Sequence, residues 1–220
     1  MAFALIQTAS RPLLAGGGAA AASPAEADRA VATLRADYER WSRWALGIAA
    51  FAATAGGLFV AAGLAATMTA LGLVTPADVA VVIVAALLAV AGAALLAALW
   101  RSGRALTRGA ASWLRAPYAN GSRAPRGAGW VQARTVNLEP RILVRLITAT
   151  LALLIAVGGL ALFARDVAAG FSLMTVPALL AGLVAGLSGV GQIGGVMRIV
   201  GGMSARDPLW SRLTGAVRRS

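Results

Sequence analysis

Long apolar stretches, separated by short polar ones, dominate this chain of 220 residues. Four of them carry no charged residue at all: 44–77, 79–100, 146–164 and 167–197. Each is about as long as the roughly 20 residues that cross the apolar core of a bilayer as a helix. We therefore predict an all-α, polytopic membrane protein with four transmembrane helices.

Helix-start signals fix where two helices begin. Ser23 is followed by Pro24 and Glu26, and Thr75 is followed by Pro76 and Asp78. In both cases a hydroxyl residue is placed to cap the helix, proline occupies its first position, and an acid three residues on can bond back to the cap. The turns after the first and third spans are short. We therefore expect two antiparallel hairpins, at 44–100 and 140–200.

The remaining segments are polar or rich in small residues. A Gly/Ala run predicts a flexible N-terminal leader over residues 1–22. Apolar and polar residues alternate with helical periodicity over residues 23–43, which predicts an amphipathic cytoplasmic helix. Residues 101–139 are expected to form a basic cytoplasmic loop. Residues 201–220 are expected to form a basic tail with a short amphipathic helix after Asp207.

Charge is distributed very unevenly along the chain, whose formal net charge is +12. All 20 basic residues are Arg, and 19 of them lie outside the outer turns that join the two helices of each hairpin. Because basic residues stay on the cytoplasmic side of a membrane, both termini and the middle loop are predicted to be cytoplasmic. The Ala-rich and Lys-free usage suggests a bacterial source, hence the bacterial inner membrane.

The chain lacks the residues that catalysis and metal binding most often use. The chain has no His and no Cys, and none of its eight acids falls in the middle of a span. We therefore expect no catalytic site, no metal and no cofactor, and the protein is not predicted to be an enzyme. Of the acids nearest the spans, Asp78 fits a helix cap. Asp166 is expected to be solvated in a turn beside Arg165.

After the second span, four arginines are spaced so that they share one side of a predicted helix, and they form a basic stripe along it. Leu106, Ala110, Trp113 and Leu114 are on the opposite side of the same predicted helix. Such a helix next to a span is typical of an interfacial segment on anionic lipid. The alternative is charge that sets topology and binds nothing in particular; nucleic acid is not an expected partner. The predicted contacts with lipid headgroups are Arg101, Arg104, Arg108 and Arg115.

The fourth span has two faces of small residues, which allow helices to approach closely in lipid. Gly182, Gly186 and Gly189 form one face, and Gly191 and Gly195 belong to the other. The second face could serve another subunit, or the helix could be central with two neighbours in its own chain. Gln192 is the polar residue of this span that most needs a partner. We predict a hydrogen bond to another helix, with a pore or ligand contact as the alternative.

The two predicted hairpins share landmarks. Arg40, the Gly56-Gly57 pair and Pro76 recur as Arg141, the Gly158-Gly159 pair and Pro177, with 36 residues from Arg to Pro in both. This repetition raises the hypothesis of a duplicated hairpin.

These features favour a non-catalytic integral membrane protein. We expect a scaffold or accessory subunit of a membrane complex, with anionic lipid and either a membrane protein or further copies of the chain as partners. The alternative is a subunit of an oligomeric channel or transporter.

Overall fold

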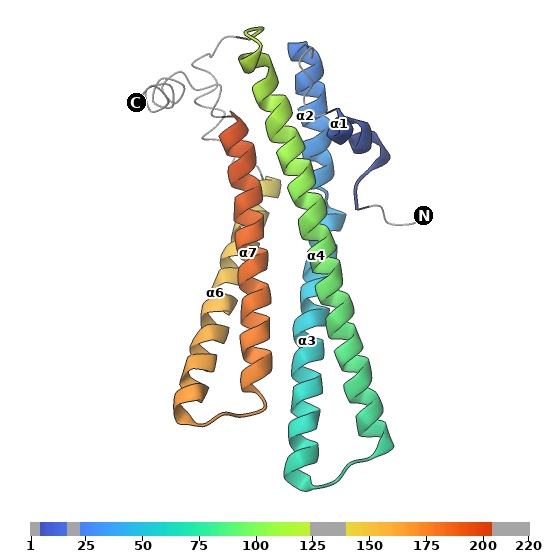
Figure 1. Ribbon diagram of the computed structural model, residues 1–220, viewed down its shortest axis with the longest axis vertical. Helices are drawn as coiled ribbons and strands as arrows, with labels where there is room; N and C mark the ends of the chain where they lie inside the picture. The colour runs from blue at the N-terminus through green and yellow to red at the C-terminus, as the bar shows by residue number, and fades with distance from the viewer. Residues whose placement is uncertain (1–4, 17–22, 124–139, 204–220) are drawn as a thin grey trace. The chain divides into compact units, whose positions relative to one another are not determined.

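The computed structural model describes residues 5–16, 23–123 and 140–203, and every regular element in them is a helix (Figure 1). Helices α3, α4, α6 and α7 carry the four stretches that are long and apolar enough to cross a membrane, as in a multi-pass membrane protein. In order, the elements are a 3-10 turn at Thr8–Ser10, α1 (Arg11–Ala15), α2 (Pro24–Tyr38), α3 (Trp41–Leu71), α4 (Pro76–Ala119), α6 (Pro140–Ala169) and α7 (Thr175–Met203).

The chain divides into two compact units. One, here called the span unit, comprises Trp44–Trp100 and Ile147–Gln192. The other, here called the basic unit, comprises Met1–Arg43, Arg101–Leu146 and Ile193–Ser220. The boundaries between the units fall close to the ends of the charge-free stretches, so the division follows the charge pattern of the sequence. Residues of α3, α4, α6 and α7 belong to both units.

Both predicted helix starts are confirmed. At α2 the Ser23 hydroxyl accepts from the Glu26 amide, and the Ser23 amide donates to the Glu26 carboxylate at 2.9 Å. At α4 the Asp78 amide donates to the Thr75 hydroxyl, and the Asp78 carboxylate accepts from the Thr75 amide, both at 3.2 Å. These reciprocal bonds satisfy N–H groups that a helix start leaves without partners.

The expectation for Asp166 is wrong. Helix α6 continues to Ala169, which places Asp166 within its last turn, and its side chain is only 17% exposed. One carboxylate oxygen accepts from Arg165, and the other accepts from the Thr175 hydroxyl at 3.2 Å. Because Thr175 begins α7, this bond ties the end of one helix to the start of the next. Gly170, with a φ of 132°, makes the reversal between them.

Two glycines bring α3 and α4 together. A Cβ at Gly57 would clash with the carbonyl oxygen of Ala85 and would lie 2.9 Å from the amide nitrogen of Ala89. A Cβ at Gly92 would lie 2.6 Å from the carbonyl oxygen of Ala50. Each helix therefore contributes one glycine at which the two backbones come close together. In lipid, such backbone contact replaces the hydrophobic effect that would drive packing in water.

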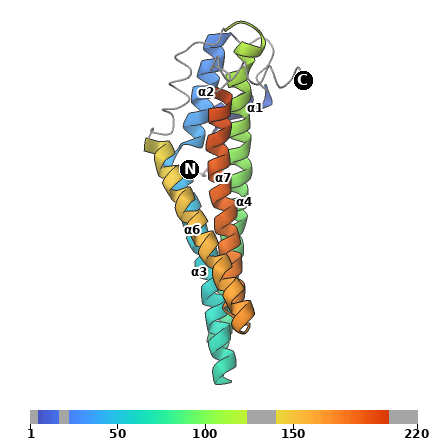
Figure 2. The same ribbon diagram turned by 90° about the vertical axis from the view of Figure 1, so that its left-hand side faces the viewer.

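Helices α6 and α7 use the same device, and Figure 2 shows α6 running obliquely across α7. A Cβ at Gly159 would lie 2.6 Å from the carbonyl oxygen of Ala178, and one at Gly189 would lie 2.9 Å from that of Ala149. In both pairs the second glycine of the Gly-Gly motif faces the partner helix. Around the first glycine, Gly56 or Gly158, a Cβ would meet nothing within 4 Å.

The register of the two helix pairs differs. Gly57 meets residues 28 and 32 positions further along the chain, whereas Gly159 meets residues 19 and 23 positions further along. Gly57 and Gly159 therefore both face the partner helix, but they meet it at different positions along its length. Duplication stays a hypothesis, with changes in helix length needed after it.

The basic unit has an apolar core of its own, to which α2, α4, α6 and α7 all contribute. Leu34 and Leu106 are fully buried at its centre. The core members are Val31, Leu34, Tyr38, Leu106, Ala110, Leu114, Ile142 and Val196. Residues that the sequence placed in a cytoplasmic helix, a loop and the ends of two spans thus form one folded unit.

The expected flexible leader is in part an ordered segment. Residues 5–16 contain the 3-10 turn and α1, and Ile6, Leu13 and Leu14 pack against the core. Within the expected basic loop, residues 101–119 continue α4 without a break. The rest of that loop after Arg123, and the helix predicted after Asp207, lie outside the described residues.

Candidate functional site

The predicted arginine stripe lies on the part of α4 that belongs to the basic unit. Arg101, Arg108 and Arg115 are exposed, and Arg104 is half-buried. On the other side of the helix Leu106, Ala110 and Leu114 are between 0% and 3% exposed. The two faces are therefore separated as the periodicity of the sequence suggested, and three guanidinium groups seven residues apart follow one line along the helix.

The apolar side of this helix is covered by protein. Leu106, Ala110 and Leu114 belong to the core that α2 shares, and Leu14 packs where a Cβ at Gly109 would stand. The indole N–H of Trp113 donates to the carbonyl oxygen of Leu13 at 3.0 Å. The segment therefore differs from the expected interfacial helix: most of its apolar face packs against protein, and Trp113 is the member of that face that stays partly exposed.

The arginines also differ in height along α4. Arg108 follows Arg101 by seven residues and Arg115 follows it by fourteen. At a rise of about 1.5 Å per residue these intervals are about 10 Å and about 21 Å. Because Arg101 is the first charged residue after the apolar stretch of the same helix, it is the one nearest to that stretch.

The glycine faces of α7 both have neighbours in this chain. A Cβ at Gly182 would lie 3.2 Å from Gly159 Cα, and one at Gly186 would lie 3.3 Å from Ala156 Cβ, both on α6. On the second face, a Cβ at Gly191 would lie 2.9 Å from the Trp100 ring. In the basic unit, a Cβ at Gly195 would clash with the Tyr38 hydroxyl. These contacts agree with α7 as a helix that has neighbours in its own chain on both faces, and an interface with another subunit stays the alternative.

Gln192 has its cross-helix partner. The Thr148 hydroxyl of α6 donates to the Gln192 side-chain oxygen of α7 at 3.1 Å. This is the packing role that the sequence predicted rather than the alternative of a pore or ligand contact. A polar bond between helices in hydrocarbon contributes on the order of 0.6 kcal/mol or slightly more.

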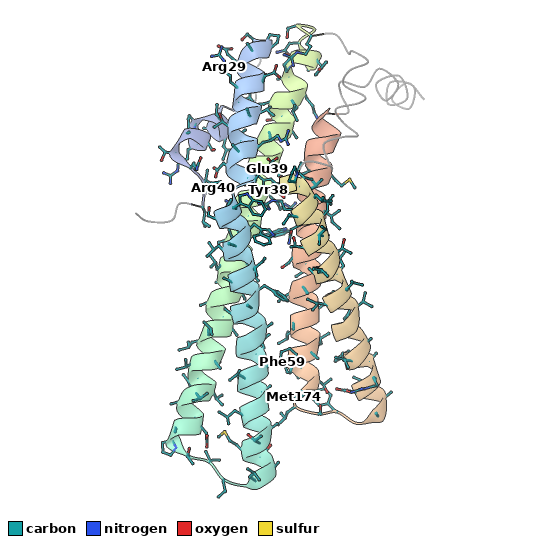
Figure 3. All side chains as sticks on the ribbon, turned by 180° about the vertical axis from the view of Figure 1, so that it is seen from behind. Arg29, Tyr38, Glu39, Arg40, Phe59 and Met174 are labelled. Carbon is teal, nitrogen blue, oxygen red and sulfur yellow. The ribbon has the colours of Figure 1, made fainter. Side chains whose placement is uncertain are left out.

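A cluster of buried charges at the break between α2 and α3 was not found from the sequence. Figure 3 shows Tyr38, Glu39 and Arg40 at this break, where the helix stops for two residues. Asp37 is fully buried and Arg43 is 5% exposed. Arg40 pairs with the Asp37 carboxylate at 3.0 Å, and Arg43 donates to the Ser102 hydroxyl at 2.9 Å. Nothing in the sequence marked them, since these residues fall on the polar side of the predicted helix.

Arg145 of α6 joins the same cluster. Its guanidinium lies over the Tyr38 ring, 4.6 Å from the ring centre, and donates to the Tyr38 carbonyl oxygen at 2.7 Å. Stacking of this kind suits arginine because its planar cation is weakly hydrated. Tyr38 thereby connects α2 to α6 and, through Gly195, to α7.

The far end of the basic unit is closed by an ion pair. Arg123 donates to both carboxylate oxygens of Asp28, at 2.9 and 2.7 Å, and to the carbonyl oxygen of Pro24 at 3.2 Å. The hydrogen bond with Asp28 raises the pKa of Arg123 above its ordinary value, so this side chain stays charged. The pair links the segment just after α4 to the N-terminal half of α2.

Among the residues that the structure describes, no group of three His, Cys, Asp or Glu side chains is placed to hold a metal ion. Comparison of the chain with protein-family models, with curated proteins and with solved structures returns no match. The arrangement of charged and apolar surfaces therefore carries the functional argument.

Proposed function

We propose that this protein is a non-catalytic scaffold or accessory subunit of a membrane complex, which contacts anionic lipid through its arginines. In this proposal the four helices cross a bacterial inner membrane as two antiparallel hairpins. The basic unit and both termini are cytoplasmic. The support is the distribution of charge, because 19 of the 20 Arg belong to the basic unit and one to the span unit.

The observation that carries the lipid contact is the continuity of α4. A single helix leads from an apolar stretch directly to Arg101, with Arg104 one turn further. Each Arg near an anionic surface contributes about 1 kcal/mol, and the effect falls off within a Debye length of about 8 Å at physiological salt. Arg115, about 21 Å beyond Arg101, is outside that range when α4 stands upright. The lipid contact is therefore assigned to Arg101 and Arg104, and not equally to all four.

The lipid contact can be tested with spin-labelled lipids around the full-length protein in mixed bilayers. The preference for phosphatidylglycerol over phosphatidylcholine should fall about fivefold in Arg101→Gln, the equivalent of about 1 kcal/mol. Arg115→Gln is the matched control and should leave the preference unchanged. Equal losses in both variants, or none in either, would refute this assignment.

The scaffold role requires a face for another membrane helix, and α3 has one. Ala45, Ala49, Ala52 and Gly56 are exposed and recur at helical spacing. Small residues at that spacing let two helices approach closely in lipid. This face supports the proposal because a Cβ at Gly56 would meet no other atom of the described residues within 4 Å, whereas one at Gly186 or Gly191 would meet a neighbouring helix.

Purification in a mild detergent, followed by mass spectrometry, distinguishes the two functions. A stoichiometric second protein supports the scaffold, whereas a homogeneous ring of copies supports the alternative of a channel or transporter subunit. Gly56→Leu should release the partner without lowering the melting temperature of the isolated chain. If the partner is retained at full occupancy, the face on α3 is not the interface.

Topology is tested separately with reporter fusions. Insertion at Thr75 should report the exterior, and fusion after Asn120 should report the cytoplasm. A cytoplasmic signal at Thr75 would contradict the proposed hairpins.

A further inference from the structure

The N-terminal segment of residues 5–15 crosses the break between α2 and α3. Its backbone is held on both sides of that break by side chains that are almost completely buried. The Gln7 amide donates to the Asp37 carboxylate of α2 at 2.8 Å. Two residues earlier, the Leu5 carbonyl oxygen accepts from the Arg43 guanidinium of α3. The two anchors therefore come from the last turn of one helix and the first turn of the next.

Other contacts fix the segment along its length. The Leu13 carbonyl oxygen accepts from the Trp113 indole, and Leu14 packs against Gly109 of α4. Ser10 is fully buried between these points. The segment is thus attached at both ends, so its position at the break is determined by more than one bond.

Short-range backbone hydrogen bonds flank the break. The Glu39 amide donates to the Arg35 carbonyl oxygen and closes α2, and the Arg43 amide donates to the Arg40 carbonyl oxygen at 3.2 Å. Arg40 stays close to α2 through its ion pair with Asp37. Arg43 is also bound to Ser102 of α4, and the Tyr38 carbonyl oxygen to Arg145 of α6. The N-terminal segment differs from these contacts because it binds both sides of the two-residue break at once.

We propose that residues 5–15 act as a splint across this break. Asp37 and Arg43 both form hydrogen bonds with the same short stretch of backbone. The segment therefore restrains the start of α3 relative to α2. The docking of the segment and the order of the break are then one linked equilibrium. Release of the segment, by a partner or by cleavage, would loosen the point where α3 leaves the basic unit.

A single substitution can remove one anchor without changing the rest. Gln7 has a φ of −65°, the value that proline requires, and its side chain is exposed. Gln7→Pro therefore deletes the amide that donates to Asp37, whereas the matched control Gln7→Ala keeps it. Because the lost hydrogen bond is to a charged group, opening of the segment should increase roughly ten- to hundredfold.

Hydrogen exchange of the full-length protein in lipid nanodiscs measures the linkage. In Gln7→Pro, exchange should accelerate both in residues 5–16 and in residues 39–44, whereas Gln7→Ala should match the parent chain. Acceleration in residues 5–16 alone would overturn the proposal, because the segment would then be packed on the surface without restraining the break. No acceleration in either region would overturn it as well.

A second variant keeps the test decisive if proline perturbs folding. Arg43→Lys retains the charge but loses the planar fork that reaches both Leu5 and Ser102. It should accelerate exchange in the same two regions, with exchange in the middle of α4 unchanged. Unchanged exchange at residues 39–44 in this variant would again contradict the splint.

Discussion

The two adjacent glycines of α3 give a controlled test of the helix contact in the span unit. Gly57→Ala puts a methyl group against the Ala85 carbonyl oxygen and 3.0 Å or less from the amide nitrogen and Cβ of Ala89. Backbone atoms cannot move aside as a flexible side chain can, so α3 and α4 must separate. Gly56→Ala adds the same methyl group to the same helix, where nothing lies within 4 Å.

The expected magnitude follows from the difference between the variants. Both replace Gly by Ala in a helix, which favours folding by up to about 1 kcal/mol, and this gain cancels in the comparison. Overpacking of a close contact costs about 1–3 kcal/mol, and it applies to Gly57→Ala alone. At about 2–4 °C per kcal/mol for a chain of this size, the two melting temperatures should differ by about 2–12 °C.

Thermal unfolding of the purified chain in a mild detergent, followed by circular dichroism, supplies the measurement. Gly57→Ala should melt below the parent chain or close to it, and Gly56→Ala at the same temperature or above. The pair Gly159→Ala and Gly158→Ala should repeat the result in α6. Equal melting temperatures within either pair would show that backbone contact at the second glycine does not hold those helices together.

Three further predictions concern contacts elsewhere in the fold. Gly186→Leu should lower the melting temperature because the Cβ alone would lie 3.3 Å from a Cβ of α6. The control Leu187→Ala, at a 71% exposed position, should change the melting temperature little. A larger loss in Leu187→Ala than in Gly186→Leu would exclude this face as a packing surface. Thr148→Val and Gln192→Leu should each destabilise the chain, and a double-mutant cycle should return a coupling of about 0.6 kcal/mol, against zero if the bond contributes nothing. Arg123→Gln should lower the free energy of unfolding by less than about 1 kcal/mol, since its ion pair is partly exposed. Because folding raises the pKa of Arg123, its stabilisation is complete below the ordinary arginine pKa and is lost only above it, so the loss should be the same from about pH 6 to about pH 9.

Helix starts were predictable because the signals are local. Ser23 and Thr75 cap their helices through residues three positions away, and the chain needs no tertiary contact to make those bonds. The apolar stretches were predictable for a similar reason, since their length and lack of charge are properties of the sequence alone. The C-terminal ends of the helices were harder to predict from the sequence. Helix α6 continues through Arg165 and Asp166, and the Asp166 carboxylate accepts from Thr175, nine residues further along, which no local pattern indicates.

The arginine stripe shows the same division. Its helical spacing was visible in the sequence, and so was the apolar side formed by Leu106, Ala110 and Leu114. What covers that side was not, because an amphipathic pattern is the same whether lipid or protein lies against it. In the structure α2 and the N-terminal segment bury it.

The sequence by itself determined the class of protein, the number of long apolar helices, the two helix caps and the uneven charge, since each depends on composition or on neighbours within four residues. Only the tertiary structure decided which glycines meet a backbone, because Gly56 and Gly57 differ by one helical position and by nothing in their chemistry. The structure alone also decided that Asp37 and Arg43 are buried. Both side chains bind backbone of residues 5–15, more than twenty positions away, and long-range packing of this kind leaves no local pattern in the chain.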